Sequence, residues 1–381
     1  MDVSIFILIL LKNYEHLFMS IVQNILAKAV AMDASDVHLK ADAPPFFRVR
    51  GVLVESGLPK LSGDDLKRTI EDILPAHLKK KPELDLEMDF SHYEDGVGRF
   101  RVNAFMSRNI PTMAFRYVKT NIPTIAELHL PPILESLALT DSGIIMLSGA
   151  TSSGKSTTLA ALLDCVNRHQ RCRIITVEDP MEYIFTDMQS VITQREVGLD
   201  TPSFHSALKH VLRQDPDVIM IGEMRDSISL SVALSAAETG HLVLSTLHVN
   251  TAAQSVHRIL DFFPNNERDQ VRMTLAGNLA AVLCQRLVPA KQGGVMAAVE
   301  IMVNTPTVRK LISENKLDVL PAAIETGTED GMQTFNQALL KMIKSGIVTE
   351  KNGLACSPSP EQLKMNLQGI FLDEGRRILG R

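Results

Sequence analysis

The segment that most constrains the fold of this chain is the eight-residue motif GATSSGKS at residues 149–156. It follows an apolar stretch, GIIMLS at 143–148, and leads into KSTTLAALLDCV, which is typical of a helix. Glycines at both ends of such a loop let backbone N–H groups turn inward around an anion, and a helix N-terminus adds positive potential. Strand, loop and helix in this order predict an α/β protein that binds a nucleotide through its phosphates.

Each position of this motif has an expected role. We expect Lys155 to reach the β- and γ-phosphates and Ser156 to give an oxygen ligand to Mg²⁺. The implied cofactors are therefore ATP and Mg²⁺. The residues expected to contact the nucleotide are Gly149, Ala150, Thr151, Ser152, Ser153, Gly154, Lys155, Ser156 and Thr157.

The apolar stretch before the motif is one of four in the second part of the chain. The other three lie at 172–179, 217–223 and 241–248, and sequence typical of helices separates each from the next. Continuous apolar strands that alternate with helices predict a doubly wound α/β domain, because its parallel strands are buried on both faces.

The sequence before this domain follows a different pattern. Short alternating stretches predict strands, and amphipathic stretches predict helices at 20–32 and 62–75, the second capped by Ser62. This pattern predicts a small α+β domain. The expected divisions of the chain are a tail or start-site artefact at 1–18, the small domain at 19–118, a linker at 119–132, the ATPase core at 133–304 and a C-terminal helical region at 305–381.

Acidic residues follow two of the predicted strands. Glu223 comes after DVIMIG and is placed to polarise an attacking water. Glu178 and Asp179 end another strand, and we expect them to help hold Mg²⁺ through water, together with Ser156. Two alternatives stay open: Glu223 as a favourable acid at a helix N-terminus, and the adjacent acids as a capped turn before Pro180.

Composition excludes several classes of protein. The formal charge of −5 gives no broad basic face for nucleic acid, and the four cysteines form no C-x-x-C pair that would indicate a zinc site. The apolar run at 3–11 is too short to span a bilayer. We therefore expect a cytoplasmic protein with no integral membrane segment and no nucleic-acid partner.

Taken together, the motifs resemble one family. The motif GATSSGKS is followed in order by ITVEDPMEY (175–183), QREVG (194–198), DPDVIMIGEMRD (215–226) and TGHLVLSTLHVNTA (239–252). This series resembles the secretion-ATPase superfamily, and most closely the type IV pilus twitching-motility (retraction) ATPases, which are PilT/PilU-like. The resemblance covers residues 20–345.

The resemblance implies an architecture and an activity. It implies a homohexamer whose subunits have an N-terminal PAS-like α+β domain, a C-terminal RecA-like P-loop ATPase domain and a helical C-terminal extension. It also implies that ATP hydrolysis drives pilus retraction. The implied partner is an inner-membrane pilus platform protein, which would hold this ATPase peripherally at the inner membrane.

The resemblance also adds residues to the expected site. It places His248 and His241 near the terminal phosphate, where an imidazole reports whether that phosphate is present; a turn cap is the alternative for each. It brings Arg101 and Arg116 of the small domain toward the nucleotide, where a guanidinium stabilises charge on phosphoryl oxygens. Plain solvent-facing arginines are the alternative. Interface or positioning roles are expected for Arg195 and Arg225.

Other functions stay open on the sequence alone. Pilus assembly and type II secretion ATPases usually carry a four-cysteine zinc module, a spacing this chain does not have. Retraction ATPases carry an A-I-R-N-L-I motif, whereas residues 307–312 read TVRKLI, which leaves an accessory retraction paralogue as an alternative. A RecA-like nucleic-acid translocase is disfavoured because aromatic residues make up only 5% of the chain. A non-hydrolysing nucleotide switch would not need Glu223.

Overall fold

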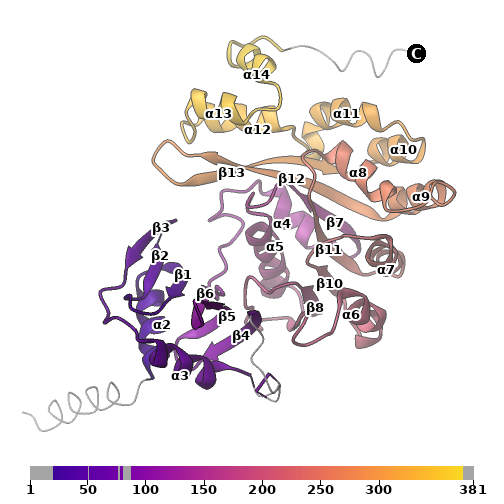
Figure 1. The fold of residues 1–381 in the computed structure, drawn as a ribbon. Helices are drawn as coiled ribbons and strands as arrows, with labels where there is room; N and C mark the ends of the chain where they lie inside the picture. The colour runs from indigo at the N-terminus through magenta and orange to yellow at the C-terminus, as the bar shows by residue number, and fades with distance from the viewer. Residues whose placement is uncertain (1–19, 50, 76–77, 80–86, 372–381) are drawn as a thin grey trace, which may run out of the picture. The chain divides into compact units, whose positions relative to one another are not determined.

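The computed structural model describes residues 20–49, 51–75, 78–79 and 87–371 (Figure 1). Its internal contacts divide the chain into two compact units, Met1–Thr120 and Asn121–Arg381. The predicted tail at 1–18 lies outside the described residues. Across the described ranges, no helix is both long enough and apolar enough to cross a membrane.

The first unit is an antiparallel sheet with two helices. Its elements are α2 (Ile21–Ala31), β1 (Ala34–Leu39), β2 (Phe46–Val49), β3 (Val52–Glu55), α3 (Gly63–Ile73), β4 (Glu87–Glu94), β5 (Gly98–Ser107) and β6 (Ile110–Tyr117). The strand order is β3-β2-β1-β6-β5-β4, and the paired strands run antiparallel. Helix α2 contacts β1 and α3 contacts β6. The helices predicted at 20–32 and 62–75 are confirmed.

Local sequence explains why these elements form. The Ser62 hydroxyl accepts a hydrogen bond from the Asp65 N–H, and the Asp65 carboxylate accepts one from the Ser62 N–H. This reciprocal pair is a capping box, and it stabilises the first turn of α3. Along β5, alternation buries Phe100 and Val102 in the core of this unit. The intervening Arg101 therefore lies on the other face of the sheet, as its spacing predicts.

The second unit is built on a seven-stranded sheet. Its strands are β7 (Gly143–Ser148), β8 (Arg173–Glu178), β9 (Val191–Glu196), β10 (Val218–Ile221), β11 (Leu242–Leu247), β12 (Leu279–Pro289) and β13 (Val295–Val303). Its α-helices are α4 (Ile133–Ala138), α5 (Lys155–His169), α6 (Phe204–Val211), α7 (Ser227–Glu238), α8 (Ala252–Asp261), α9 (Arg268–Asn278), α10 (Pro306–Ser313), α11 (Leu320–Thr326), α12 (Phe335–Lys344), α13 (Glu350–Cys356) and α14 (Pro360–Leu367). Short 3₁₀ turns are η1 (Leu212–Gln214), η2 (Leu317–Val319) and η3 (Thr328–Asp330).

Most of this sheet is parallel. The strand order is β13-β12-β7-β11-β10-β8-β9, with parallel pairing from β12 to β9 and one antiparallel hairpin, β12–β13. The four apolar stretches predicted as strands are β7, β8, β10 and β11, which confirms a mixed α/β fold with a parallel sheet. Strands β9, β12 and β13 were not predicted.

Helices cover both faces of the parallel sheet, so its strands are buried. Residues of α4 and α5 pack on one face, whereas α6, α7, α8 and the C-terminal helices pack on the other. The carboxyl ends of β7, β8, β10 and β11 lie along one edge because these strands are parallel and in register. That edge is where the predicted loop and three of the predicted site residues follow their strands.

Candidate nucleotide-binding site

The loop at 149–156 has the backbone shape that its glycines predict. Gly149 has φ +151° and Gly154 has φ +86°, and the non-glycine Ser152 between them has φ +62°. Helix α5 begins directly after Gly154, so its free N–H groups open onto the loop. This arrangement suits an anion bound by backbone amides at a helix N-terminus.

Both glycines are also required by a close neighbour on β12. A Cβ atom at Gly149 would lie 2.6 Å from the carbonyl oxygen of Gln285, and one at Gly154 would lie 2.8 Å from the Gln285 amide nitrogen. The Gln285 side chain donates to the carbonyl oxygen of Ser153 at 2.8 Å and accepts from the Thr158 hydroxyl at 2.8 Å. The sequence analysis missed Gln285, although a glutamine inside the apolar run LAAVLCQRLV is an available signal.

Lys155 lies folded over the loop. Its ammonium donates to the carbonyl oxygens of Gly149 at 2.7 Å and Ala150 at 2.9 Å, and the side chain is buried. Burial lowers the pKa of Lys155, an effect that the carboxylates of Glu223 and Glu182 oppose. The ammonium group of Lys155 is therefore held against the backbone of the loop.

Two hydroxyl groups complete the loop. The Ser153 hydroxyl is buried without a hydrogen-bond partner, and it lies against the space that a Cβ at Gly149 would fill. The Thr157 hydroxyl lies 2.9 Å from the phenol oxygen of the buried Tyr183. A buried donor left unpaired beside inward-turned amides fits an acceptor such as a phosphate oxygen, since such groups are normally paired. The loop residues thus fit the phosphates of ATP.

Glu223 is brought together with two other predicted residues. Its carboxylate lies 2.9 Å from Arg225 Nε through Oε2 and 3.2 Å from His248 Nε2 through Oε1. His248 comes from the end of β11, the neighbouring strand. The loop follows β7 and Glu223 follows β10, and both strands are parallel neighbours of β11 in the sheet. An acid, an imidazole and a guanidinium thus meet at the phosphate-binding edge of the sheet.

Glu178 lies one strand further along the same edge in a different setting. The side chain is buried, and its Oε1 accepts from the Thr176 hydroxyl at 2.7 Å and from the Gln194 amide at 3.1 Å. Burial raises the pKa of Glu178 to about 7, although these hydrogen bonds and one from the Glu182 backbone oppose the rise. The side chains that donate hydrogen bonds to Glu178 are neutral groups rather than cations.

The neighbouring Asp179 belongs to the Glu223 cluster instead. Its Oδ2 lies 3.6 Å from Arg225 Nη1. Arg225 therefore bridges Asp179, which follows β8, and Glu223, which follows β10. Among the described residues, no group of three histidine, cysteine, aspartate or glutamate side chains could hold a metal. Proteins usually hold Mg²⁺ through one or two side-chain oxygens while phosphates and water supply the rest. The Ser156 hydroxyl in the first turn of α5 and the Asp179 carboxylate directly after β8 are oxygen ligands of that kind.

The structure does not bring His241 to this cluster. His241 precedes β11, whereas His248 follows it, and a six-residue strand of about 3.3 Å per residue separates them. The His241 Nδ1 atom lies 2.9 Å from the carbonyl oxygen of Ala236 and 3.0 Å from the Thr239 hydroxyl, at the end of α7. The alternative of a turn cap describes His241, and its predicted nucleotide contact finds no support within one chain.

The two predicted arginines of the first unit are neighbours. Arg101 on β5 and Arg116 on β6 are paired across the two strands. Arg116 Nε lies 2.9 Å from Asp36 Oδ1, and Arg101 Nη2 lies 3.9 Å from Asp89 Oδ1. Both guanidinium groups belong to the sheet face opposite the core, where they remain candidates for contact with another part of the assembly.

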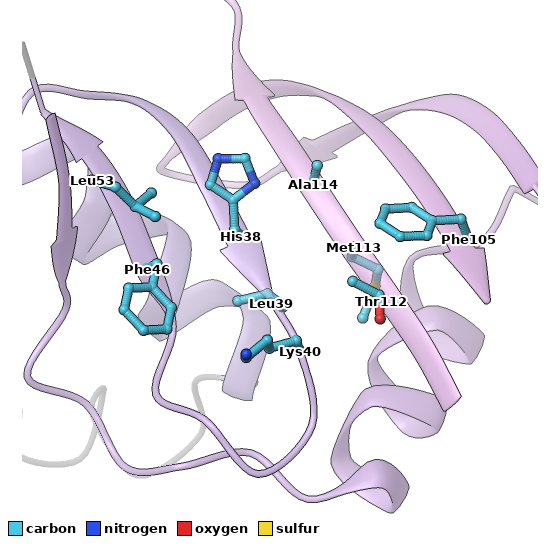
Figure 2. Close-up of a pocket in the computed structure, with 9 residues that line it drawn as sticks. All are labelled: His38, Leu39, Lys40, Phe46, Leu53, Phe105, Thr112, Met113 and Ala114. Carbon is cyan, nitrogen blue, oxygen red and sulfur yellow. The ribbon is translucent and has the colours of Figure 1, made fainter. Parts of the chain in front are cut away.

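A separate pocket of about 280 Å³ lies in the first unit. Figure 2 shows its lining residues, which include Phe46 and Phe105 and lie on the sheet strands around His38. The Nε2 atom of His38 is buried without a hydrogen-bond partner. No predicted site residue lines this pocket. The candidate site is therefore defined by the strand ends of the second unit.

Comparisons with known proteins show the family of the chain. The family described as "Type II/IV secretion system protein" matches residues 12–293. The chain is 41% identical over 347 residues to the type IV pilus ATPase PilU of Pseudomonas aeruginosa, covering 91% of both chains. It is 40% identical over 340 residues to the retraction ATPase PilT of the same organism, covering 89% of this chain and 99% of that one.

A solved structure shares the fold over nearly the whole chain. It is the crystal structure of the pilus retraction motor PilT with bound ADP, which has a TM-score of 0.84 and 40% sequence identity. The similarity covers 91% of this chain and 99% of that chain.

Proposed function

The chain belongs to the type II/IV secretion system protein family, and from that membership we propose that it is a mechanochemical ATPase that drives type IV pilus retraction, or twitching motility. The observation that carries the proposal is the meeting of Glu223, His248 and Arg225 at the edge of the sheet where the loop with Lys155 also lies. A nucleotide-binding protein that only switches would not need an acid held in this position.

The residues of the site have distinct tasks in this proposal. When bound, Mg²⁺–ATP supplies the phosphoryl group that is transferred to water. Lys155 and the loop N–H groups bind and orient the phosphates, while Ser156 and Asp179 hold the metal side of the site. Glu223 accepts a hydrogen bond from the attacking water at a carboxylate oxygen and so orients it.

His248 and Arg225 act on Glu223. Both lie against its two carboxylate oxygens, so they fix the direction in which the carboxylate faces. Because His248 follows β11, a shift of its imidazole on phosphate release would be carried into that strand. We propose that this is how the state of the nucleotide reaches the rest of the subunit.

The division of the chain supports a two-domain motor. The antiparallel sheet with two helices supports a PAS-like domain at 19–118, and the parallel sheet covered on both faces supports a RecA-like core at 133–304, joined through a linker at 119–132. Helices α10 to α14 fall within the proposed C-terminal region at 305–381.

The assembly and its location are also part of the proposal. We propose a homohexamer that contacts an inner-membrane pilus platform protein from the cytoplasm, with no nucleic-acid partner. In that assembly Arg101 and Arg116 would approach the nucleotide. The support is family membership and the exposed face of the sheet that carries both arginines.

An accessory retraction role is the second candidate. The observation that favours it is the TVRKLI sequence at 307–312, which departs from the A-I-R-N-L-I motif of retraction ATPases. The identities to the proteins named PilU and PilT are 41% and 40%, so neither relative is distinctly nearer.

A count of surface pili tests these alternatives. In cells whose only copy carries Lys155→Ala, the phosphates lose their point-charge partner and we expect extra pili that never retract. Lys351→Ala is the matched control, since Lys351 is an exposed lysine on α13. Fewer pili would instead indicate an assembly or secretion motor. Normal retraction with unchanged numbers would indicate the accessory role.

A further inference from the structure

Gln285 occupies an unusual position for a polar side chain. It lies on β12 within a strand of the central sheet and is only 4% exposed. Burying an amide is costly unless its donors and acceptor are paired. Here the amide nitrogen donates to Ser153 and the amide oxygen accepts from Thr158, so both ends of the group are satisfied by the phosphate loop and the helix after it.

The contact with Ser153 fixes a backbone amide as well. The peptide bond between Ser153 and Gly154 is trans, so the Ser153 carbonyl and the Gly154 N–H point in opposite directions. By holding the carbonyl oxygen toward β12, Gln285 turns the Gly154 N–H away from β12 and into the loop. Gly154 has φ +86° and no side chain to restrict this peptide plane, so the plane depends on an outside partner.

The Ser153 carbonyl, which can only accept, fixes which way the amide faces, and the Thr158 hydroxyl then donates to the amide oxygen. If the amide were reversed, its oxygen would face the Ser153 carbonyl oxygen, and two acceptors would meet. Only the observed orientation pairs donors with acceptors. The main-chain oxygen of Gln285 also packs where a Cβ at Gly149 would lie, so one residue contacts both ends of the loop.

We propose that Gln285 is a positioning residue for nucleotide binding: it holds the Ser153–Gly154 peptide so that the Gly154 N–H is aimed at a bound phosphate. The inference rests on the proposed function, because it assumes that this loop binds ATP and ADP. It goes beyond that function by assigning the shape of the loop to a residue outside the motif.

Two variants with matched chemistry test the role. Gln285→Ala removes the amide, and Gln333→Ala is its control. Gln333 is also buried, donates to the Val299 carbonyl at 2.9 Å and accepts from Lys341 at 3.0 Å, but it lies elsewhere in the unit. By calorimetry, the ADP Kd should rise about tenfold in Gln285→Ala and stay within about twofold of wild type in Gln333→Ala. AMP, which has no β-phosphate, should show no such difference.

A third variant tests the hydrogen bonds rather than the shape. In Gln285→Glu, a protonated carboxyl group offers one donor and one acceptor, as the amide does, whereas the ionised form can only accept. We therefore expect ADP binding near wild type at pH 5.5 and about tenfold weaker than wild type at pH 8.5. The wild-type protein, measured at the same pH values, supplies the reference ratio.

The outcomes separate the inference from the function it rests on. A wild-type chain that binds no ADP would overturn the proposed function itself. If wild type binds ADP but Gln285→Ala behaves as Gln333→Ala does, only the positioning role fails. Equal weakening of the glutamate variant at both pH values would also overturn it, because the loss would then not depend on the donor that protonation restores.

Discussion

Two glutamates follow neighbouring strands at the same edge of the sheet, and their surroundings differ completely. Glu178 ends β8 in a buried setting of neutral donors, the Thr176 hydroxyl and the Gln194 amide. Glu223 follows β10 and lies between Arg225 and His248. Identical side chains one strand apart thus have different partners: Glu223 lies between a guanidinium and an imidazole, whereas burial raises the pKa of Glu178 to about 7.

The largest expected effect is on turnover at Glu223. Glu223→Gln keeps the shape of the side chain but removes its ability to take a proton, so kcat for ATP hydrolysis should fall at least about 100-fold. The Kd for ADP should stay within about twofold of wild type. Steady-state hydrolysis and calorimetry measure both quantities. Turnover that survives this change would remove Glu223 from the role of base.

Glu178→Gln is the matched change on the neighbouring strand. Since Glu178 already carries neutral partners, we expect this variant to lose much less activity than Glu223→Gln when both are assayed side by side at pH 7. A loss as large as that at Glu223 would break the comparison and give Glu178 a direct part in the chemistry.

The next effect separates two histidines. His248→Ala removes a partner of Glu223 at the phosphate edge, so it should abolish retraction while the ADP Kd changes by no more than about twofold. His241→Ala removes only a contact at the end of α7 and should cost about 1 kcal/mol of stability without changing ADP affinity. Twitching assays and chemical denaturation measure the two responses. Equal loss of nucleotide affinity and motility in His248→Ala would contradict its sensor role.

A smaller effect is a pH dependence of stability that belongs to Glu178. Its folded-state pKa of about 7 exceeds the ordinary 4.5, so the folded chain binds the extra proton between these values. The free energy of unfolding should therefore fall as pH rises from about 4.5 to about 8, by about 3 kcal/mol, and stay level above that. Urea denaturation of the nucleotide-free and metal-free protein measures this fall.

The control for that experiment is Glu178→Gln, which has no proton to lose. Its stability should change less between pH 5 and pH 8 than that of wild type, and the difference should be most of that fall. Parallel pH profiles for the two proteins would show that Glu178 titrates in its ordinary range, and the contrast with Glu223 would then be one of geometry alone.

Much of this arrangement follows from local sequence. The strands β7, β8, β10 and β11 are continuous apolar runs, and the parallel order places their carboxyl ends together, so the approach of Glu223 and His248 could be anticipated. The cap Ser62 marked a helix start because its side chain accepts from a first-turn amide. These features depend on residues close together in the chain.

The features that were missed depend on distant partners. Strand β9 begins with an exposed Val191 and carries polar residues, so it lacks the apolar run of a buried strand. The apolar run in β12 is equally compatible with a buried helix, because periodicity does not distinguish them. The burial of Glu178 and the hydrogen bond from Gln285 to Ser153 also depend on residues far away in the sequence. A local sequence pattern therefore does not predict them.

The contact between β12 and the loop at 149–156 has a consequence for the synthesis of the chain. Gln285 is 132 residues after Ser153, and the β12 register with β7 pairs Leu279–Cys284 with Ile144–Ser148. Chains emerge from the ribosome N-terminus first. A nascent chain that has reached residue 278 already displays GATSSGKS in full, yet lacks the strand that shapes it. On the proposed role of Gln285, nucleotide binding by the nascent chain therefore reaches its full strength only after β12 has joined the sheet.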